Sequence, residues 1–261
     1  MAALTCAVLF ASACSSGQNA AGSSFEPAKP GVLTVATAFL PAPGFWQGNP
    51  PTSGFEAGLA AALARRLGLD RVAVVQVPFA TIVAGQLHGA DLALSQLTPT
   101  AKRERSLDFT TPYLTAPAGV LARRGVEAGD LDSLRGLRWV ISRVSTLTPI
   151  VENRIRPTNS PIVVEDRSQA LQVLRRGKAD ALLLDLPVAL GLAHFDPKLF
   201  HVLGQLSGGE GLAAALPRGS QNEEIVDSAI RSLQADGTIS GLTSRWLGEN
   251  EQDVPLILTE E

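Results

Sequence analysis

Thr98, Thr100 and Arg103 lie together on a short polar segment that follows an apolar run at 92–94. The apolar run is typical of a buried strand, and Pro99 prevents that strand from continuing. Thr100 can then cap a short helix, which would place free backbone N–H groups close to the guanidinium of Arg103. Hydroxyls, N–H donors and a planar guanidinium together suit a small carboxylate. The segment therefore predicts an anion-binding turn.

The same turn also has a simpler interpretation. Arg103 could form an ordinary surface ion pair with Glu104 or Asp108, and exposed pairs of this kind are common and weak. A second chemically unusual position is Asp185, which ends an apolar run of Ala and Leu, where an unpaired carboxylate would be costly. Its simplest structural role is to cap a helix that begins near Pro187.

The composition excludes several classes of function. The chain has 261 residues, a net charge of -3 and 45% hydrophobic residues, which indicates a soluble globular protein with a sizeable core in one or two domains. The negative charge and the lack of a Lys/Arg run argue against a nucleic-acid partner. His88, His194 and His201 are far apart and carry no ligand spacing, so we predict neither a metal site nor a cofactor.

The N-terminal residues have the pattern of a secretion signal. Residues 1–13 are uncharged, mostly apolar and too short to span a bilayer, as expected for a signal peptide. The sequence from Ala11 to Cys14 resembles a bacterial lipobox, so Cys14 is the expected lipidation site; a plain secretory peptide is the alternative. Residues 14–30, rich in Ser and Gly, then form a lipidated flexible tether. Because Cys6 would be removed, no disulfide is possible.

From residue 31 onward, short β-like runs alternate with helical stretches, which predicts mostly parallel sheets with helices on both faces. The expected strands are Val32–Ala38, Val72–Val77, Ala90–Ser95, Leu137–Ser142, Ile162–Glu165, Ala181–Leu184 and Leu212–Leu216. The expected helices are Phe55–Leu67, Thr81–His88, Pro149–Arg156, Ser168–Arg176, a helix up to Ala235 that starts in a capping box of Ser220 and Glu223, and Thr238–Leu247.

Two such series of strands and helices predict two lobes rather than one large sheet. The small-residue segments Leu114–Gly119 and Ser207–Gly211 suit hinge strands between them. We therefore expect lobe 1 to comprise 31–116 plus 210–248, lobe 2 to comprise 117–209, and 249–261 to form a C-terminal tail.

Several motifs occur in the order found in one known family. They are Gly54-Phe-Glu56 with Leu59, Val77-Pro-Phe79, Thr100-x-x-Arg103 followed by Asp108-Phe109 and Pro112-Tyr113, Lys178-Ala-Asp-Ala181 with Asp185, Leu216-Pro-Arg-Gly219, and Trp246-Leu-Gly248. Over nearly all of 31–248 the chain resembles family 3 extracellular solute-binding proteins, the amino-acid-binding subunits of ABC importers. The resemblance implies the type II periplasmic-binding-protein fold, with two lobes joined by two hinge strands.

The resemblance also implies roles for the charged residues. Arg103 would bind the α-carboxylate of the ligand through two hydrogen bonds, because a planar guanidinium matches a carboxylate better than an ammonium does. The backbone of Gln96 and the hydroxyl of Thr98 would assist. Asp185 would accept the α-ammonium group, which supplies the partner that its position lacks.

Further positions follow from the same resemblance. Phe39 and Phe79 would enclose the ligand backbone, with core packing as the alternative for both. The N-terminus of a second-lobe helix would offer N–H groups to the carboxylate, and it corresponds to Thr146, Leu147 and Thr148. Arg143 stands where some members carry a Lys that contacts the ligand side chain, which favours Glu, Gln or Asp as ligand. Arg143 could equally point to solvent.

The resulting prediction is a non-enzymatic, monomeric, extracytoplasmic protein, lipid-anchored to the bacterial membrane. It would capture a free L-amino acid with a polar or acidic side chain and deliver it to an ABC permease. One alternative is an enzyme on the same fold, similar to cyclohexadienyl dehydratases, which would need a general acid such as Glu210 in the cleft. The other alternative is an amino-acid sensor domain.

Overall fold

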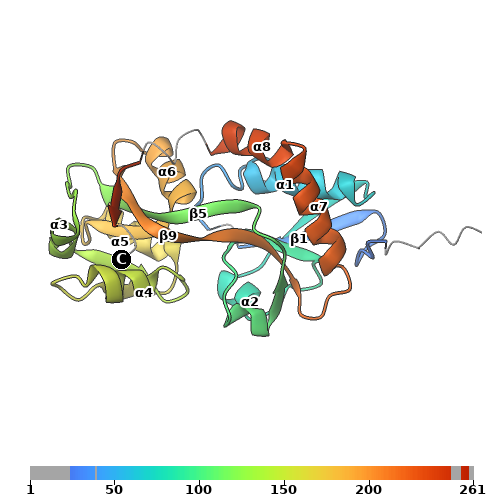
Figure 1. The fold of residues 1–261 in the computed structure, drawn as a ribbon, viewed down its shortest axis with the longest axis horizontal. Coiled ribbons are helices and arrows are strands. Elements are labelled where there is room, and N and C mark those ends of the chain that lie inside the picture. Colours follow the sequence, from blue (N-terminus) through green and yellow to red (C-terminus); the bar gives the residue numbers. More distant parts are fainter. Residues whose placement is uncertain (1–23, 39, 248–253, 259–261) are drawn as a thin grey trace, which may run out of the picture.

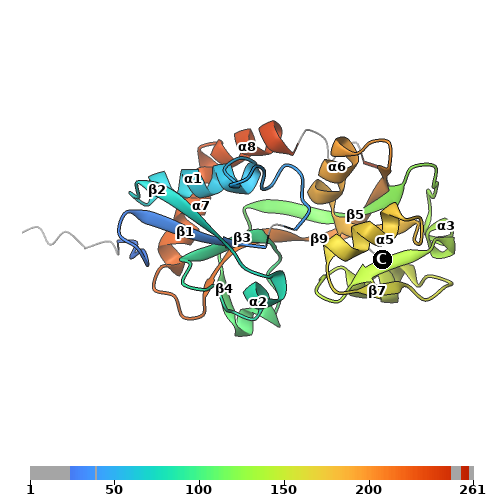
Figure 2. The same ribbon diagram turned by 180° about the vertical axis from the view of Figure 1, so that it is seen from behind.

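The computed structural model describes residues 24–38, 40–247 and 254–258. Two groups of strands and helices lie side by side, and two long strands run from one group to the other (Figures 1 and 2). We call the group that contains β1 the first lobe and the group that contains β6 the second lobe. None of the helices in the described ranges is long and apolar enough to cross a membrane.

The first lobe has a mixed sheet in which β1 pairs in parallel with β2 and β3, while β9 runs antiparallel to β3 and β4. Its strands are β1 (Val32–Thr37), β2 (Arg71–Gln76), β3 (Leu92–Leu97), β4 (Leu107–Phe109) and the C-terminal part of β9 (Phe200–Pro217). Its helices are α1 (Phe55–Arg66), α2 (Phe79–Val83), the 3-10 turn η1 (Arg103–Arg105), α7 (Glu223–Ala235) and α8 (Thr238–Trp246).

In the second lobe, β6 pairs in parallel with β7 and β8, and β8 runs antiparallel to β5. Its strands are β5 (Leu114–Arg123), β6 (Trp139–Ser142), β7 (Ile162–Val164), β8 (Ala181–Asp185), the N-terminal part of β9 and β10 (Leu256–Leu258). Its helices are α3 (Leu131–Gly136), α4 (Thr148–Ile150), the π-helical turn η2 (Val151–Ile155), α5 (Arg167–Arg175) and α6 (Leu186–Phe195).

The two long strands, β5 and β9, connect the lobes as an antiparallel pair whose register shifts near the middle. Pro117 lies opposite Gly209, but the next residue, Ala118, lies opposite Leu206, so residues 207 and 208 have no opposite residue on β5. Such a bulge interrupts the ladder and bends the strand. The expected lobe boundaries at 116/117 and 209/210 fall at this bulge.

The C-terminal segment extends the second-lobe sheet. Strand β10 pairs in parallel with β9, and the backbone N–H of Gln205 donates to the carbonyl of Pro255 at 2.8 Å. The side chain of Ile257 packs against the core of the second lobe. The segment 249–261, which we expected to form a C-terminal tail, therefore contains a strand, and that strand belongs to the second-lobe sheet.

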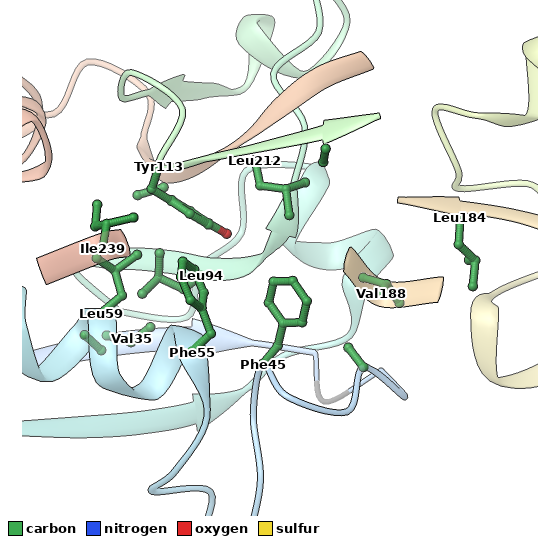
Figure 3. Packing of buried hydrophobic residues seen from close by; sticks show 14 of the residues in the cluster. Val35, Phe45, Phe55, Leu59, Leu94, Tyr113, Leu184, Val188, Leu212 and Ile239 are labelled. Atoms are coloured by element: carbon green, nitrogen blue, oxygen red, sulfur yellow. The ribbon is translucent and has the colours of Figure 1, made fainter. Parts of the chain in front are cut away.

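One apolar cluster extends across the junction of the lobes (Figure 3). Phe45 lies on the segment between β1 and α1, and its ring packs edge-on against Phe55 with 5.8 Å between the ring centroids. The cluster continues to Leu184 on β8 and Val188 on α6. The lobes of this structure are therefore in direct apolar contact as well as covalently connected.

Several of the expected helices differ in extent from those observed, and two of them show why. Helix α2 ends at Val83 rather than continuing to His88, because Gly85, His88 and Gly89 all have positive φ angles, which no helix accommodates. Helix α7 begins at Glu223, and its N-cap makes no side-chain capping bond, so the expected capping box is absent.

Candidate functional site

A cavity lies between the lobes, where β3 and β8 end and where α4 and α5 begin. About 670 Å³ of space lies between its atoms, part of it open to solvent. Ligand sites in α/β proteins commonly form at the carboxyl ends of strands, as here. Most of the predicted site residues line this cavity: Phe79, Gln96, Thr98, Arg103, Thr146, Leu147, Thr148 and Asp185. Phe39 lies outside the described residues.

Arg103 is the first residue of η1 and is buried. Its Nη1 donates to the carbonyl of Thr98 at 2.8 Å, and its Nη2 donates across to the carbonyl of Val144 in the second lobe at 3.2 Å. The guanidinium carbon lies 5.4 Å from the centre of the Phe79 ring. The backbone N–H of Arg103 donates to Thr100 Oγ1 at 3.2 Å, but the N-cap position of η1 is Lys102 rather than the expected Thr100. The guanidinium is thus held in a fixed orientation at the cavity wall.

Of the two carboxylates considered as ion-pair partners for Arg103, Glu104 and Asp108, the structure pairs Asp108 with a different arginine. Asp108 is buried and forms an ion pair with Arg218. Its second oxygen accepts hydrogen bonds from the backbone N–H groups of Gly219 and Ser220. Asp108 therefore ties the end of β9 to the first lobe.

Gln96 has a left-handed backbone with φ of 49°, which is uncommon for a residue other than glycine. Its backbone N–H donates to Glu56 Oε1 at 2.8 Å, and its side-chain amide donates to Glu56 Oε2. The Tyr113 hydroxyl donates to Glu56 Oε1 at 2.6 Å. Glu56 has no exposed surface, and this burial raises its pKa, while the three hydrogen bonds oppose the rise. Glu56 thus fixes the conformation of Gln96 from behind.

Arg167 lines the cavity but is absent from the sequence-based prediction. It is the first residue of α5, and its Nη2 donates to Gln96 Oε1 at 2.8 Å across the gap between the lobes. Burial lowers its pKa to about 10, although the charge of Asp185, followed by those of Glu56 and Asp166, favours the cation. Asp166 caps α5 by accepting from the N–H of Gln169, so α5 starts one residue before the expected helix.

Asp185 ends β8 and lines the cavity, where it is half-buried. It occupies the N-cap position of α6, but its side chain makes no capping hydrogen bond. The simple capping role proposed as an alternative is therefore not the one that this side chain has. Arg103 comes from the first lobe and Asp185 from the second, so the cavity has a charged group of opposite sign on each side.

The segment Thr146–Thr148 reaches the cavity, but its helix is short. Helix α4 comprises only Thr148–Ile150, and the Thr148 hydroxyl donates to the carbonyl of Ser142 at 2.8 Å. The N–H of Leu147 donates to Ser145 Oγ at 3.2 Å. Part of the expected donor set is therefore engaged within the turn itself.

Arg143 is not brought into the cavity. Its Nε donates to Glu165 Oε1 at 3.0 Å, and the two side chains are 63% and 69% exposed. Ser142, the preceding residue, lines the cavity, and neighbouring residues at a strand end point to opposite sides. The solvent-facing alternative for Arg143 is the one observed.

The family model for bacterial extracellular solute-binding proteins, family 3, matches residues 33–249. The chain belongs to this family. The family 3 assignment and the type II two-lobed fold expected from the sequence are thereby confirmed.

Known family 3 proteins share about a quarter of their residues with this one. The L-cystine-binding protein TcyJ of Escherichia coli K12 is 25% identical over 222 residues, which are 84% of this chain and 83% of TcyJ. A structure of an ancestral arginine-binding protein bound to glutamine is 26% identical, covers 85% of this chain and 100% of its own, and superposes with a TM-score of 0.73. The ancestral amino acid-binding protein AncCDT-1, described as a precursor of cyclohexadienyl dehydratase, is 25% identical with a TM-score of 0.69; the match covers 83% of this chain and 95% of its own.

Proposed function

We propose that this protein binds a free L-amino acid with a polar or acidic side chain and delivers it to the permease of an ABC importer outside the cytoplasm. The observation that supports this most directly is the pair of opposite charges, Arg103 on one lobe and Asp185 on the other, at a single cavity. An amino acid carries the complementary pair, a carboxylate and an ammonium group. The relatives named above as cystine- and arginine-binding proteins support an amino acid as the ligand, without bearing on its side chain.

In the proposed mode of binding, the guanidinium of Arg103 receives the α-carboxylate with help from the Thr98 hydroxyl. The backbone N–H of Gln96 already donates to Glu56, so the Gln96 backbone does not assist the carboxylate as the sequence suggests. Asp185 accepts the α-ammonium group, and the ring of Phe79 covers one face of the ligand. Since the two ends of the ligand are held by different lobes, binding and closure are one equilibrium. The contact from Arg103 to Val144 already joins the lobes at this point, so the described arrangement corresponds to a closed form.

We further propose that the protein acts as a binder rather than as an enzyme like the dehydratases. A dehydratase needs a general acid next to its substrate. Among the described residues that line the cavity, Asp185 is the one carboxylate, and the proposed role already uses it. Glu210, the other candidate acid, pairs through its backbone with Ala116, and its side chain lies outside the described part of the structure.

The test is a calorimetric screen of the common amino acids followed by the Arg103→Ala variant. Each hydrogen bond to a charged group contributes about 1.5–3 kcal/mol, so loss of a two-bond contact should weaken binding by about 100-fold or more. Arg143→Ala is the matched control, because this exposed arginine lies outside the cavity and should leave affinity unchanged. Affinity of Arg103→Ala within a few-fold of the wild type would refute the proposed site.

A further inference from the structure

The side chains that line the cavity carry two positive charges and one negative charge. Arg103 and Arg167 are the cations, and Asp185 is the carboxylate, among the described residues of the lining. The proposed binding mode uses Arg103 for the α-carboxylate and Asp185 for the α-ammonium group. A neutral zwitterion would therefore leave the charge of Arg167 without a counterpart on the ligand. The charges of Asp185, Glu56 and Asp166 favour the Arg167 cation, and a ligand carboxylate would add to this stabilisation, so the charge of the lining bears on the choice of ligand.

The contacts of Arg167 hold its guanidinium at the cavity wall with hydrogen-bonding capacity to spare. Nη2 is held by Gln96 Oε1 at 2.8 Å, and Gln96 is itself held by Glu56. Nε is buried and has no hydrogen-bond partner within the described residues. A buried donor without an acceptor costs about 1–3 kcal/mol, and a ligand oxygen would remove that cost.

The charge of Glu56 favours the Arg167 cation, but Glu56 does not line the cavity. Its two oxygens accept from Gln96 and Tyr113, and it lies behind Gln96 rather than in the cavity lining. The lining residues on β6 and β8, which pack against α5, are mostly apolar: Val140, Ile141, Leu182, Leu183 and Leu184 line the cavity beside Ser142 and Asp185. A cationic ligand side chain would meet no second carboxylate among these residues.

We infer that Arg167 determines specificity by binding a second carboxylate, so that the preferred ligand is a dicarboxylic amino acid of net charge -1. This inference rests on the proposed function and names the ligand class for the same site. It assigns to Arg167 the role that the sequence suggests for Arg143. Gln96 then supports this subsite, because its side chain accepts a hydrogen bond from Arg167 and is itself held by Glu56.

The experiment compares L-glutamate, L-aspartate, L-glutamine and L-arginine by calorimetry on the wild type and on Arg167→Gln. The wild type should bind one of the two dicarboxylates at least about ten-fold more tightly than L-glutamine, and L-arginine more weakly still. Arg167→Gln should reduce that preference to near unity by weakening the dicarboxylate while changing L-glutamine only a few-fold. Arg176→Gln, at the exposed far end of α5, is the control and should behave as the wild type.

Two results would overturn the inference. Wild-type protein that binds L-glutamine or L-arginine as tightly as the dicarboxylates would refute it, while leaving the amino-acid site itself intact. Equal weakening of L-glutamate and L-glutamine by Arg167→Gln, with an unchanged melting temperature, would show that Arg167 serves closure rather than specificity. Failure of every amino acid to bind the wild type would instead refute the proposed function.

Discussion

Glu56 carries a carboxylate that is shielded from solvent and accepts three hydrogen bonds, two from Gln96 and one from Tyr113. These bonds keep Gln96 in its left-handed conformation, on which the orientation of Arg167 depends. Burial of a carboxylate disfavours its charged form, and the Tyr113 hydroxyl is the strongest of the groups that counteract this. Glu56 lies outside the cavity but, through Gln96, helps to orient Arg167 at the cavity wall.

Replacement of Tyr113 by Phe should destabilise the protein in a pH-dependent manner. The folded-state pKa of Glu56 lies above 4.5, so its contribution to stability falls as the pH rises through the interval above 4.5. Without the hydroxyl this pKa rises further, and the ionised carboxylate loses a donor. The variant should therefore lose about 1–3 kcal/mol near neutral pH and less near pH 4.5. Urea unfolding at both pH values measures this, and an identical loss at the two would contradict it.

The residues of the site differ in how far the sequence predicts them. Arg103 and Asp185 can be identified because each follows an apolar run in a familiar motif. Arg143 and Arg167 are both cations close to a strand end of the second lobe, and nothing in their spacing tells which one points inward. Glu56 belongs to a recognisable motif, but its contact with Gln96 depends on how α1 packs against β3.

Among the elements, α6 makes an unusually close contact with the segment that follows β1. Gly191 on α6 is buried, and a Cβ atom on it would lie 2.5 Å from the carbonyl oxygen of Pro43. Real Cβ atoms do not approach backbone oxygens this closely, so the two elements must move apart if this glycine is replaced. The contact joins the second lobe to the first.

The variant Gly191→Ala should therefore bind ligand more weakly without loss of folding. Overpacking typically costs about 1–3 kcal/mol, which corresponds to about 5- to 150-fold weaker binding if the cost falls on the closed form. Gly241→Ala is the control, because a Cβ atom at that helical position meets no atom within 4 Å. Both variants gain helix propensity. Calorimetry compares their affinities, and equal affinity of the two would show that closure does not need this contact.

The regular elements of each lobe follow from hydrophobic patterning, whereas their ends and the connections between lobes do not. Strands β1, β3, β6 and β8 have the expected apolar runs and are central in their sheets. Strand β9 is longer than expected, because it joins the expected hinge segment and the strand after it into one element of 18 residues. Strand β9 keeps this length because β5 pairs with it along most of its residues, and no local sequence pattern indicates that pairing.

At the scale of the whole molecule, the N-terminal end of the described chain is fastened to the first lobe. The N–H of Glu26 donates to Asn222 Oδ1 at 2.9 Å, and Asn222 lies next to α7. A tether that precedes this point would therefore restrain the first lobe and leave the second lobe free to close. Cys14, the proposed site of the lipid, lies outside the described residues.

We predict that mass spectrometry of the membrane fraction from a bacterial host will find a diacylated N-terminal Cys14. Cys14→Ser should then release the protein from the membrane without changing ligand affinity, because the binding cavity lies well inside the folded region. A mature wild-type chain that begins at another residue and carries no lipid would contradict the lipid anchor predicted from the sequence.

The two-lobed architecture could be predicted from the alternation of strands and helices, but the return of the chain to the second lobe could not. Strand β10 has only three residues and follows a polar stretch, so its apolar run carries too little information for a prediction. The position of β10 is set by its parallel pairing with the edge of β9, which lies far from it in the sequence.

Because β10 pairs with β9 in the second lobe, the two ends of the described chain belong to different lobes. One end is fixed beside α7 at the far side of the first lobe, and the other is part of the second-lobe sheet (Figure 1). The distance between the two ends should therefore change when the angle between the lobes changes. A donor and an acceptor fluorophore fused to the two ends would convert ligand capture into a change in energy transfer, without any label inserted into a loop.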